Sequence, residues 1–599
     1  MNTRRLFFCL IIFFVAFLIS AEALHACVPK RTSACRHASW RKPVKAKNGM
    51  VVSAESLATL AGVDMLKSGG NAIDAAVAVG FALGVTFPEA GNIGGGGFML
   101  IRLANGKSTM IDFREKAPGK ASRNMYLDAA GNVIPKKSEY GPLAASVPGS
   151  VAGYLYALEK YGTLQRRHVV APAVEIAENG FYLSERLAEG LKQNLNEFSG
   201  FASTLKAYTK NGLPYGEGEL FRQPDLAKTL KAISEKGRDG FYKGDVADKI
   251  VAEMKRSARL LYESTDSQSR RPDGQGGIIS KEDLINYQAV EREPLYGSYR
   301  GYEIITASPP SAGGVVLLQM LNMLERFDLK SKGHNSSQAI HLFAAAAQRA
   351  YADRAEFLGD PDFVRMRIAS LVSKEYALAR GKSIDSLRAV ASTSVRAGTK
   401  AEFDQRQTTH YCVADRFGNV VAVTTTLNGL YGCKTVVDGA GFFLNNEMDD
   451  FSVKPGVPNM FGLIGNEANS IAPNKRMLSS MTPTIVLEDG KPILTTGARG
   501  GSRITTAVAN IIINVIDFGM NIQDAVESPR IHHQWLPDKI LYETNGLPRD
   551  VMENLRRMGY TLEHTPVFNA RAEAIMIDPK SGWFLGGPDP REEGVAIGY

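Results

Sequence analysis

Paired short strands follow one another through the last third of this 599-residue chain, and they restrict the fold more than any other feature. Three pairs are expected, each around a tight turn: 408–414 with 420–427, 482–487 with 491–496, and 572–577 with 583–587. β-Branched and other apolar residues fill the strands, and Gly, Asn or Asp occupies each turn, as in β-hairpins. Such local pairing is antiparallel, because parallel strands need a long crossover between them.

The first two-thirds of the chain supplies most of the helices. Residues 53–68 and 72–86 have helical apolar periods, and Asn71 can cap the second helix. That second segment is apolar on most faces, so we expect it to be buried. Residues 150–400 are mainly helical, including 317–327 and 337–354. Helices that cover stacked antiparallel sheets predict an α+β enzyme.

The run Gly91–Gly97 contains five glycines and suggests a phosphate-binding loop. It lacks both the G-x-G-x-x-G and the G-x-x-x-x-G-K-[ST] spacing, and it precedes a strand. Close backbone packing is the better interpretation. The run is expected to open a hairpin with strands 97–103 and 108–114.

Net charge excludes a nucleic-acid partner. The total is +8, but residues 1–23 carry +1 and residues 24–47 carry +7, so residues 48–599 are electroneutral. A nucleic-acid-binding domain needs a basic surface, which the folded body lacks. The hydrophobic fraction of 44% and charged fraction of 22% are those of a soluble globular protein.

An export signal is expected at the N-terminus. Arg4 and Arg5 precede the apolar stretch Leu6–Ser20, and residues 21–23 form an A-x-A cleavage site. The stretch is short for a membrane span. Residues 1–23 are therefore expected to be a cleaved signal peptide, which predicts a periplasmic or secreted protein with no stable span.

The segment after the signal has a second interpretation. Cys27 ends a sequence similar to a lipoprotein box, but His25 fits that box poorly, so a lipid anchor is the less favoured reading. Residues 24–48 are expected to be a basic flexible leader, and the folded body to begin near Gly49. Residues 256–277 include a polar run without a core-facing period, which predicts a mobile surface loop.

Cysteine and histidine spacing predicts no metal and no cofactor. No C-x-x-C or H-E-x-x-H occurs, and the adjacent His532 and His533 diverge on any regular element. Four cysteines remain after the signal, and export permits one or two disulfides without defining their pairing. These are Cys27, Cys35, Cys412 and Cys433.

Thr408 opens a strand-like run, for which a core strand is the simpler interpretation. The alternative is a nucleophile. A threonine hydroxyl is weak unless a base adjoins it, and a free N-terminal amine, with an ordinary pKa of about 7.7–8, is one such base. That alternative requires cleavage between Gln407 and Thr408.

Two further segments have a structural and a functional interpretation. The acidic cluster Asn445–Asp450 has apolar flanks, so we expect partial burial and a cationic partner such as a substrate ammonium. A solvated turn or a calcium site is the alternative. Gly500 and Gly501 either form a turn or offer paired N–H groups as an oxyanion hole.

Taken together, the motifs resemble those of the γ-glutamyltransferase (γ-glutamyltranspeptidase) family from about Gly49 to Tyr599. They occur in the family's order: Gly91–Leu100, 112–115, 309–314, 408–411, 445–451, Ser479-Ser480, 500–503 and 589–591. The resemblance implies the N-terminal-nucleophile hydrolase fold, a four-layer α/β/β/α sandwich of two stacked, mainly antiparallel sheets.

The resemblance also implies a reaction. Self-cleavage before Thr408 would leave a large subunit (24–407, folded from 49) and a small catalytic subunit (408–599), intertwined as a heterodimer. Thr408 would take the γ-glutamyl group of glutathione or related compounds as an acyl-enzyme. Water, or an amino acid or peptide acceptor, would then receive it.

Each expected site residue matches a position of the family's motifs. Thr426 would hydrogen-bond the nucleophile, and Gly500 and Gly501 would form the oxyanion hole. The α-carboxylate binders would be Arg114, Ser479 and Ser480. The α-amino pocket would comprise Asn428, Glu447 and Asp450. An arginine fork suits a carboxylate, and carboxylates suit an ammonium.

Three departures from the family pattern are evident. Glu447 replaces a glutamine of many bacterial relatives, although both side chains accept from an ammonium. Phe461 replaces a lid tyrosine, which removes a lid hydrogen bond and predicts looser gating. Residues 256–277 are an insertion without an assigned role.

Rival functions are β-lactam side-chain hydrolysis, poly-γ-glutamate processing and non-catalytic binding. Glu447 and Asp450 argue against the first, an apparent lid at 451–466 against the second, and the complete set of catalytic residues against the third. The sequence leaves open the balance of hydrolysis and transfer, the preferred acceptor and the donor's leaving group.

Overall fold

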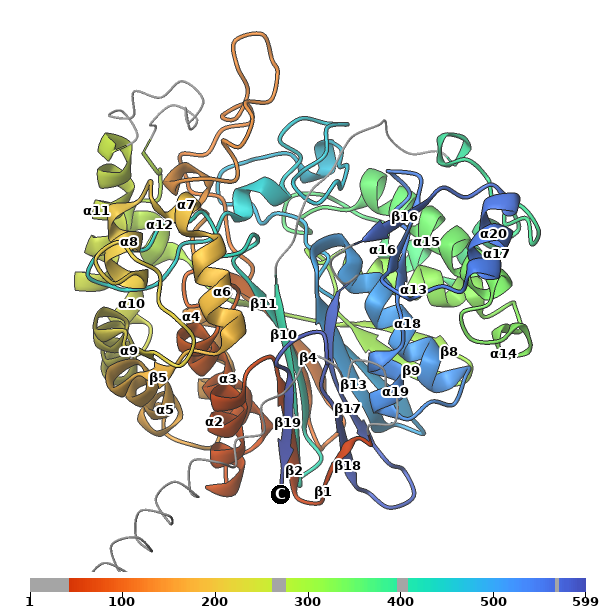
Figure 1. Ribbon diagram of the computed structural model, residues 1–599, viewed down its shortest axis with the longest axis horizontal. Helices are drawn as coiled ribbons and strands as arrows, with labels where there is room; N and C mark the ends of the chain where they lie inside the picture. The colour runs from red at the N-terminus through yellow and green to blue at the C-terminus, as the bar shows by residue number, and fades with distance from the viewer. Residues whose placement is uncertain (1–41, 261–275, 396–407, 566–569) are drawn as a thin grey trace, which may run out of the picture. The chain divides into compact units, whose positions relative to one another are not determined.

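Two seven-stranded sheets lie face to face between two layers of helices in the computed structural model (Figure 1). The structure describes residues 42–260, 276–395, 408–565 and 570–599. Several predicted features lie outside these residues: the signal peptide, Cys27, Cys35, Gln407 and residues 261–275 of the predicted 256–277 loop. The predicted start of that loop was wrong, because residues 256–260 belong to a helix that ends at Leu260. Lys42–Tyr599 form one compact unit.

Sheet 1 carries the strand that follows Thr408. Its strand order is β19 (Val595–Gly598), β2 (Gly49–Ser53), β10 (Thr409–Asp415), β11 (Val420–Thr426), β3 (Gly96–Arg102), β4 (Ser108–Asp112) and β7 (Val290–Arg292). Every neighbouring pair is antiparallel. The hairpins predicted around β3–β4 and β10–β11 are therefore confirmed.

Sheet 2 is antiparallel throughout as well. Its order is β1 (Val44–Ala46), β18 (Phe584–Gly587), β17 (Arg571–Ile577), β13 (Lys491–Arg499), β12 (Thr484–Glu488), β9 (Tyr302–Thr306) and β8 (Leu295–Tyr299). The other two predicted hairpins are β12–β13 and β17–β18. The β8–β9 hairpin lies in the segment expected to be mainly helical, and the sequence analysis missed it. A small third sheet contains β14 (Ile531–His532), β15 (Ile540–Glu543) and β16 (Leu562–Thr565).

Helices cover the outer face of each sheet (Figure 1). On the side of sheet 1 the main ones are α2 (Ser56–Lys67), α3 (Ala72–Thr86), α4 (Ser150–Tyr161), α5 (Arg166–Asn179), α6 (Glu185–Gln193), α9 (Pro224–Lys236) and α11 (Gly244–Leu260). On the side of sheet 2 they are α13 (Gly313–Leu324), α15 (Ser337–Phe357), α17 (Lys374–Gly381), α18 (Ile504–Ile516), α19 (Ile522–Glu527) and α20 (Arg549–Met558). None of the helices in the described ranges is both long and apolar enough to cross a membrane.

Strand β10 has apolar residues at consecutive positions instead of alternating apolar and polar ones, and its packing explains this pattern. Tyr411 and Val413 pack in the core beneath the helices, whereas Cys412 and Ala414 pack in the core between the sheets. Both faces of the strand are buried, so each face selects apolar residues. Helix α3 is buried on all sides, as predicted, and Asn71 caps it by accepting from two main-chain N–H groups.

The expected start of the folded body was wrong by several residues. Strand β1 lies inside the predicted 24–48 leader and pairs with β18. Lys45 of β1 is exposed, and the Lys47 ammonium lies over the Trp583 ring, 5.0 Å from its centroid. Basic residues suit an edge strand because they discourage further pairing, so the charge that indicated a leader also fits this sheet edge.

The glycine run packs closely against backbone, as expected. A Cβ atom at Gly95 would lie 1.9 Å from the Thr426 carbonyl oxygen, and one at Gly97 would lie 2.2 Å from that of Thr424. No side chain fits at such distances. The run therefore brings β3 against the strand that ends at Thr426.

Candidate active site

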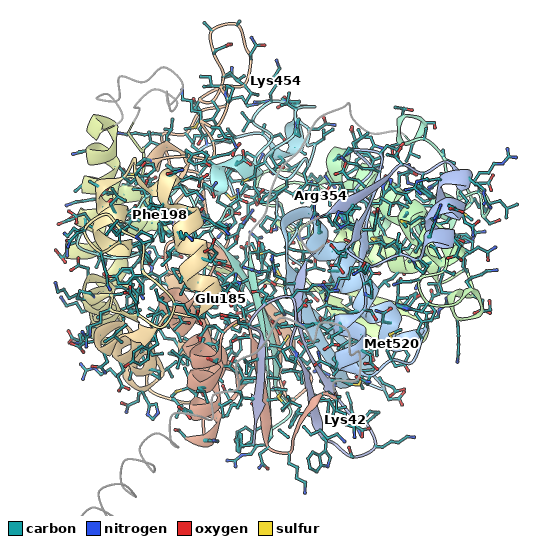
Figure 2. The ribbon with its side chains drawn as sticks, viewed as in Figure 1. Lys42, Glu185, Phe198, Arg354, Lys454 and Met520 are labelled. Carbon is teal, nitrogen blue, oxygen red and sulfur yellow. The ribbon has the colours of Figure 1, made fainter. Side chains whose placement is uncertain are left out.

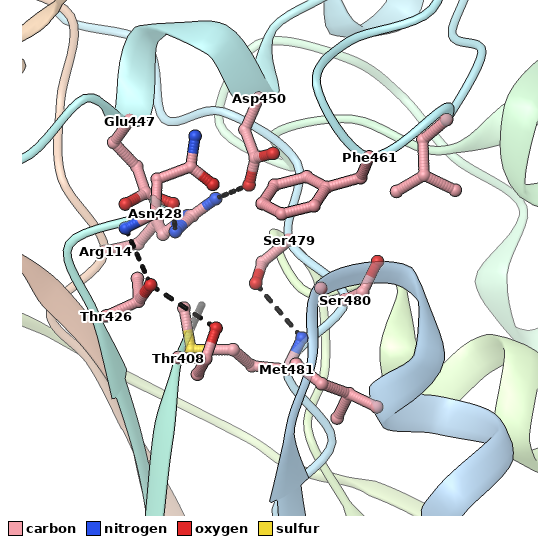
Figure 3. A pocket seen from close by; sticks show the side chains of 13 residues that line it. Arg114, Thr408, Thr426, Asn428, Glu447, Asp450, Phe461, Ser479, Ser480 and Met481 are labelled. Carbon is pink, nitrogen blue, oxygen red and sulfur yellow. Dashed lines mark hydrogen bonds and ion pairs between the residues drawn. The ribbon is translucent and has the colours of Figure 1, made fainter. Parts of the chain in front are cut away.

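The expected site residues come together in one pocket (Figure 3). The space between its lining atoms, open solvent included, is about 270 Å³. The lining residues are Arg114, Thr408, Thr426, Asn428, Glu447, Asp450, Phe461, Leu463, Ser479, Ser480, Met481, Gly501 and Ile504. Of the predicted set, Gly500 adjoins this lining, and Gln407 lies outside the described residues.

The antiparallel register brings the two threonines together. Because Thr409 pairs with Thr425 across β10 and β11, Thr408 and Thr426 lie opposite each other at the strand ends. The Thr408 hydroxyl donates to Thr426 Oγ1 at 3.4 Å. Thr426 Oγ1 also accepts from the Asn428 N–H at 2.8 Å (Figure 3). In the uncut chain the nitrogen of Thr408 is still an amide.

A buried ionic cluster forms the opposite wall of the pocket. Arg114, two residues after the end of β4, is fully buried and pairs with Glu447, with Asp450 at 2.5 Å and with Glu115 at 3.5 Å. The short 3₁₀ helix Glu447–Asp450 presents two of these carboxylates. The predicted burial of this acidic segment is thus confirmed.

Three carboxyl groups lie within 4.0 Å of the Arg114 guanidinium in this cluster. Burial raises the pKa of Glu447, Asp450 and Glu115, and the Arg114 guanidinium opposes the rise in each case. The Arg114 guanidinium thus offsets three carboxyl groups whose charge the protein interior disfavours, and the Arg354 guanidinium also lowers the pKa of Asp450. A ligand with its own cation would relieve that imbalance, so the cluster is suited to an ammonium.

The two serines lie on the segment before β12. Ser479 Oγ accepts from the Met481 N–H at 3.1 Å (Figure 3), and Ser480 Oγ accepts from Arg354 Nη2 at 3.4 Å. The sequence analysis assigned Arg354 only to an expected helix. An arginine on the buried, alanine-rich face of that helix was the available signal, because such a charge needs a reason to be buried.

Phe461 belongs to the expected lid, and its ring lies close to the Gly501 backbone. A Cβ atom at Gly501 would lie 2.5 Å from the Phe461 ring. Asn459 in the same segment donates to Asp450 Oδ1 at 3.0 Å, and the Met460 N–H donates to Asp449 Oδ2 at 2.9 Å. These bonds hold the segment without a tyrosine hydroxyl, and the looser gating expected from Phe461 remains a prediction.

Gly500 and Gly501 have φ angles of +139° and +56°, which favour glycine. Gly501 starts a 3₁₀ helix, Gly501–Arg503, whose first N–H groups have no acceptor inside the helix. Such groups can stabilise negative charge on a substrate oxygen. The geometry is compatible with the predicted oxyanion hole.

Comparison with known proteins identifies the family. The sequence profile described as Gamma-glutamyltranspeptidase matches residues 58–599. The chain belongs to the γ-glutamyltranspeptidase family. It is 47% identical over 559 residues to the Glutathione hydrolase proenzyme of Escherichia coli (strain K12), covering 93% of each chain.

Solved structures agree with this membership. A cephalosporin acylase from Bacillus halodurans superposes with a TM-score of 0.81 and 27% identity, over 96% of this chain and 99% of that chain. Helicobacter pylori gamma-glutamyltranspeptidase gives a TM-score of 0.54 and 47% identity, over 58% and 95%. The predicted N-terminal-nucleophile hydrolase fold is therefore confirmed, and the protein is an enzyme of the γ-glutamyltransferase and hydrolase type.

Two of the four cysteines expected after the signal belong to the described residues. Cys412 and Cys433 are buried free thiols, and Cys27 and Cys35 lie outside the described residues. Across the described ranges, no group of three or more His, Cys, Asp or Glu side chains is arranged to hold a metal ion.

Proposed function

We propose that this γ-glutamyltranspeptidase is an exported glutathione hydrolase and γ-glutamyltransferase that cuts its own chain before Thr408. The supporting observation is that one pocket combines the Thr408 hydroxyl with the Arg114–Glu447–Asp450 cluster. The first group can attack a carbonyl, and the second can recognise an amino acid. A relative named Glutathione hydrolase proenzyme, 47% identical, supports the donor.

Self-cleavage would begin with Thr408 itself. Its hydroxyl oxygen attacks the Gln407 carbonyl carbon, and the acyl group moves from nitrogen to oxygen. Water then hydrolyses the resulting ester, which leaves a carboxylate on Gln407 and a free α-amine on Thr408. That amine is the base that a threonine nucleophile needs.

The Thr408 hydroxyl oxygen, which attacks the chain in self-cleavage, would also be the nucleophile in catalysis. The amine takes the hydroxyl proton while Oγ1 attacks the donor's γ-carbonyl, and the N–H groups of Gly500 and Gly501 stabilise the oxyanion. The proton passes to the leaving amine as the C–N bond breaks, which leaves an ester on Thr408. Water or an acceptor amine resolves that ester. Thr426 orients the nucleophile through the 3.4 Å contact.

Recognition would proceed by an exchange of ion pairs. In the empty pocket the Arg114 guanidinium pairs with Glu447 and Asp450. The donor's α-carboxylate would take over the guanidinium, assisted by Ser479 and Ser480. Its α-ammonium would meet the released carboxylates and Asn428. No buried charge then loses its partner, which limits the desolvation cost.

Gel analysis of the mature protein tests the proposal. We expect two bands on a denaturing gel, with Thr408 at the N-terminus of the smaller one, and hydrolysis of γ-glutamyl-p-nitroanilide. Thr408→Ala should give one uncut, inactive chain. A small band that begins elsewhere would refute the cleavage site. Fractionation of the producing cell tests export through residues 1–23.

Cephalosporin side-chain hydrolysis is the second candidate, favoured by the superposition on a cephalosporin acylase over 96% of the chain. The surplus of carboxylates beside Arg114 argues against it, because a glutaryl side chain brings no ammonium. Comparing kcat/KM for γ-glutamyl-p-nitroanilide and a glutaryl cephalosporin decides between them. We expect the first donor to be strongly preferred.

A further inference from the structure

Arg354 is a buried guanidinium beside the pocket, outside the set of expected site residues (Figure 2). It lies near the end of α15, and only 6% of its surface is exposed. Its Nη2 donates to Ser480 Oγ at 3.4 Å. Among the described residues its Nε has no hydrogen-bond partner.

The electrostatic situation of Arg354 differs from that of Arg114. Arg114 has three carboxylates within 4.0 Å, whereas none of the ion pairs among the described residues includes Arg354. Burial lowers the pKa of Arg354; Asp450 is near enough to raise it, and the positive charge of Arg114 lowers it. A buried cation without a close counter-ion is costly unless an anion arrives.

Ser480 connects this charge to the pocket. It lines the cavity with Arg114 and Ser479, and its hydroxyl oxygen accepts from Arg354. With one lone pair occupied in this way, the hydroxyl proton remains available to a ligand anion in the pocket. The guanidinium therefore both orients the hydroxyl and adds positive potential behind it.

We infer that Arg354 is a positioning residue for the α-carboxylate of the donor and acts through Ser480. This inference rests on the proposed function, since it needs a donor with a carboxylate at that place. Arg114 would exchange partners when the donor binds, whereas Arg354 would gain a counter-ion that it lacks in the empty site. The anion selectivity of the pocket would thus come from two arginines, both in the part of the chain that precedes Thr408.

Three p-nitroanilide donors separate this role from a structural one. The γ-glutamyl donor has both charged groups, the glutaryl donor has only the carboxylate, and the 4-aminobutyryl donor has only the amine. For Arg354→Met we expect KM for the first two donors to rise about tenfold or more, by loss of charge-assisted binding. KM for the amine-only donor should change by less than about twofold. Arg354→Lys should restore part of the binding of the two carboxylate donors.

Arg349→Met is the matched control. Arg349 is also a buried arginine of α15, but its guanidinium donates to Ser383 and to main-chain oxygens. Arg349→Met should change KM for the three donors by the same factor. If Arg354 acts through Ser480, KM for the carboxylate donors should rise in the double variant Arg354→Met/Ser480→Ala by much less than the product of the two single-variant factors.

Several results would overturn the inference. Equal losses on all three donors, or unchanged KM for the carboxylate donors, would reduce Arg354 to a packing residue. If Arg354→Met does not fold, the donor pattern of Arg354→Lys decides by the same criterion. A wild-type enzyme without preference for the γ-glutamyl donor would instead refute the proposed function, and the inference with it.

Discussion

Asp449 holds the segment expected to be a lid, residues 451–466, to the wall of the site, and its neutralisation gives the sharpest stability test. The carboxylate is 3% exposed; it accepts from the Ser138 hydroxyl at 2.7 Å and from the Met460 N–H at 2.9 Å. Burial, and then the nearby charge of Glu139, raises the pKa of Asp449 from 3.8 to about 7. The folded chain therefore resists ionising this group.

The sign of the effect follows from proton binding. An acid with a raised pKa binds more protons in the folded chain than in the unfolded chain, so its contribution to stability falls as pH rises from about 4 to about 7. Three pKa units correspond to about 4 kcal/mol, as an upper bound. Asp449→Asn avoids this cost, since its carbonyl can accept from Met460 N–H while its amide donates to Ser138.

Thermal unfolding at two pH values measures the difference. For a unit as large as Lys42–Tyr599, 1 kcal/mol shifts Tm by about 1 °C. We expect Asp449→Asn to gain about 2–4 °C over the wild type at pH 8 and close to nothing at pH 4. Asp64→Asn, at an exposed position of α2, controls for the change in net charge.

Two outcomes would contradict this reasoning. A loss of Tm at pH 8 would mean that the ionised carboxylate stabilises the lid segment. An equal shift at both pH values would mean that ionisation of Asp449 does not differ between the folded and unfolded chains. In either case burial would not be the dominant influence on this carboxyl group.

Three further predictions concern other parts of the molecule. Asp450→Asn should lower kcat/KM sharply on γ-glutamyl-p-nitroanilide and much less on the glutaryl donor, which lacks the α-amine; equal losses would exclude an α-amino role. Gly95→Ala should prevent normal folding and maturation, seen as loss of soluble two-band protein, because its Cβ would lie 1.9 Å from the Thr426 carbonyl oxygen. Cys412 and Cys433 should not react with Ellman's reagent until the protein is denatured, because burial raises the pKa of both thiols, that of Cys433 to about 11. Rapid labelling of the native protein would show that one of them is accessible.

Local patterns in the sequence were sufficient for the elements whose partners lie nearby in the chain. The hairpin β10–β11 needs only two apolar runs and a turn, and α3 needs only a capping asparagine and a buried composition. The site residues came from another source, the resemblance to the family, because no single motif could distinguish a nucleophile from a core strand. The structure brings nearly all of these residues together in one pocket.

Other features depended on contacts between distant parts of the chain. Strand β1 forms because β18, more than 500 residues later, offers an edge, and the charge of its sequence concealed this. The buried guanidinium of Arg354 reaches Ser480 across 126 positions, and Asp449 is tied to Ser138 across 311. Sequence by itself determined the hairpins, the buried helix and the types of chemical group present. Only the tertiary structure decided which of those groups are buried close to one another, because burial and charge pairing depend on distances in space that sequence separation does not determine.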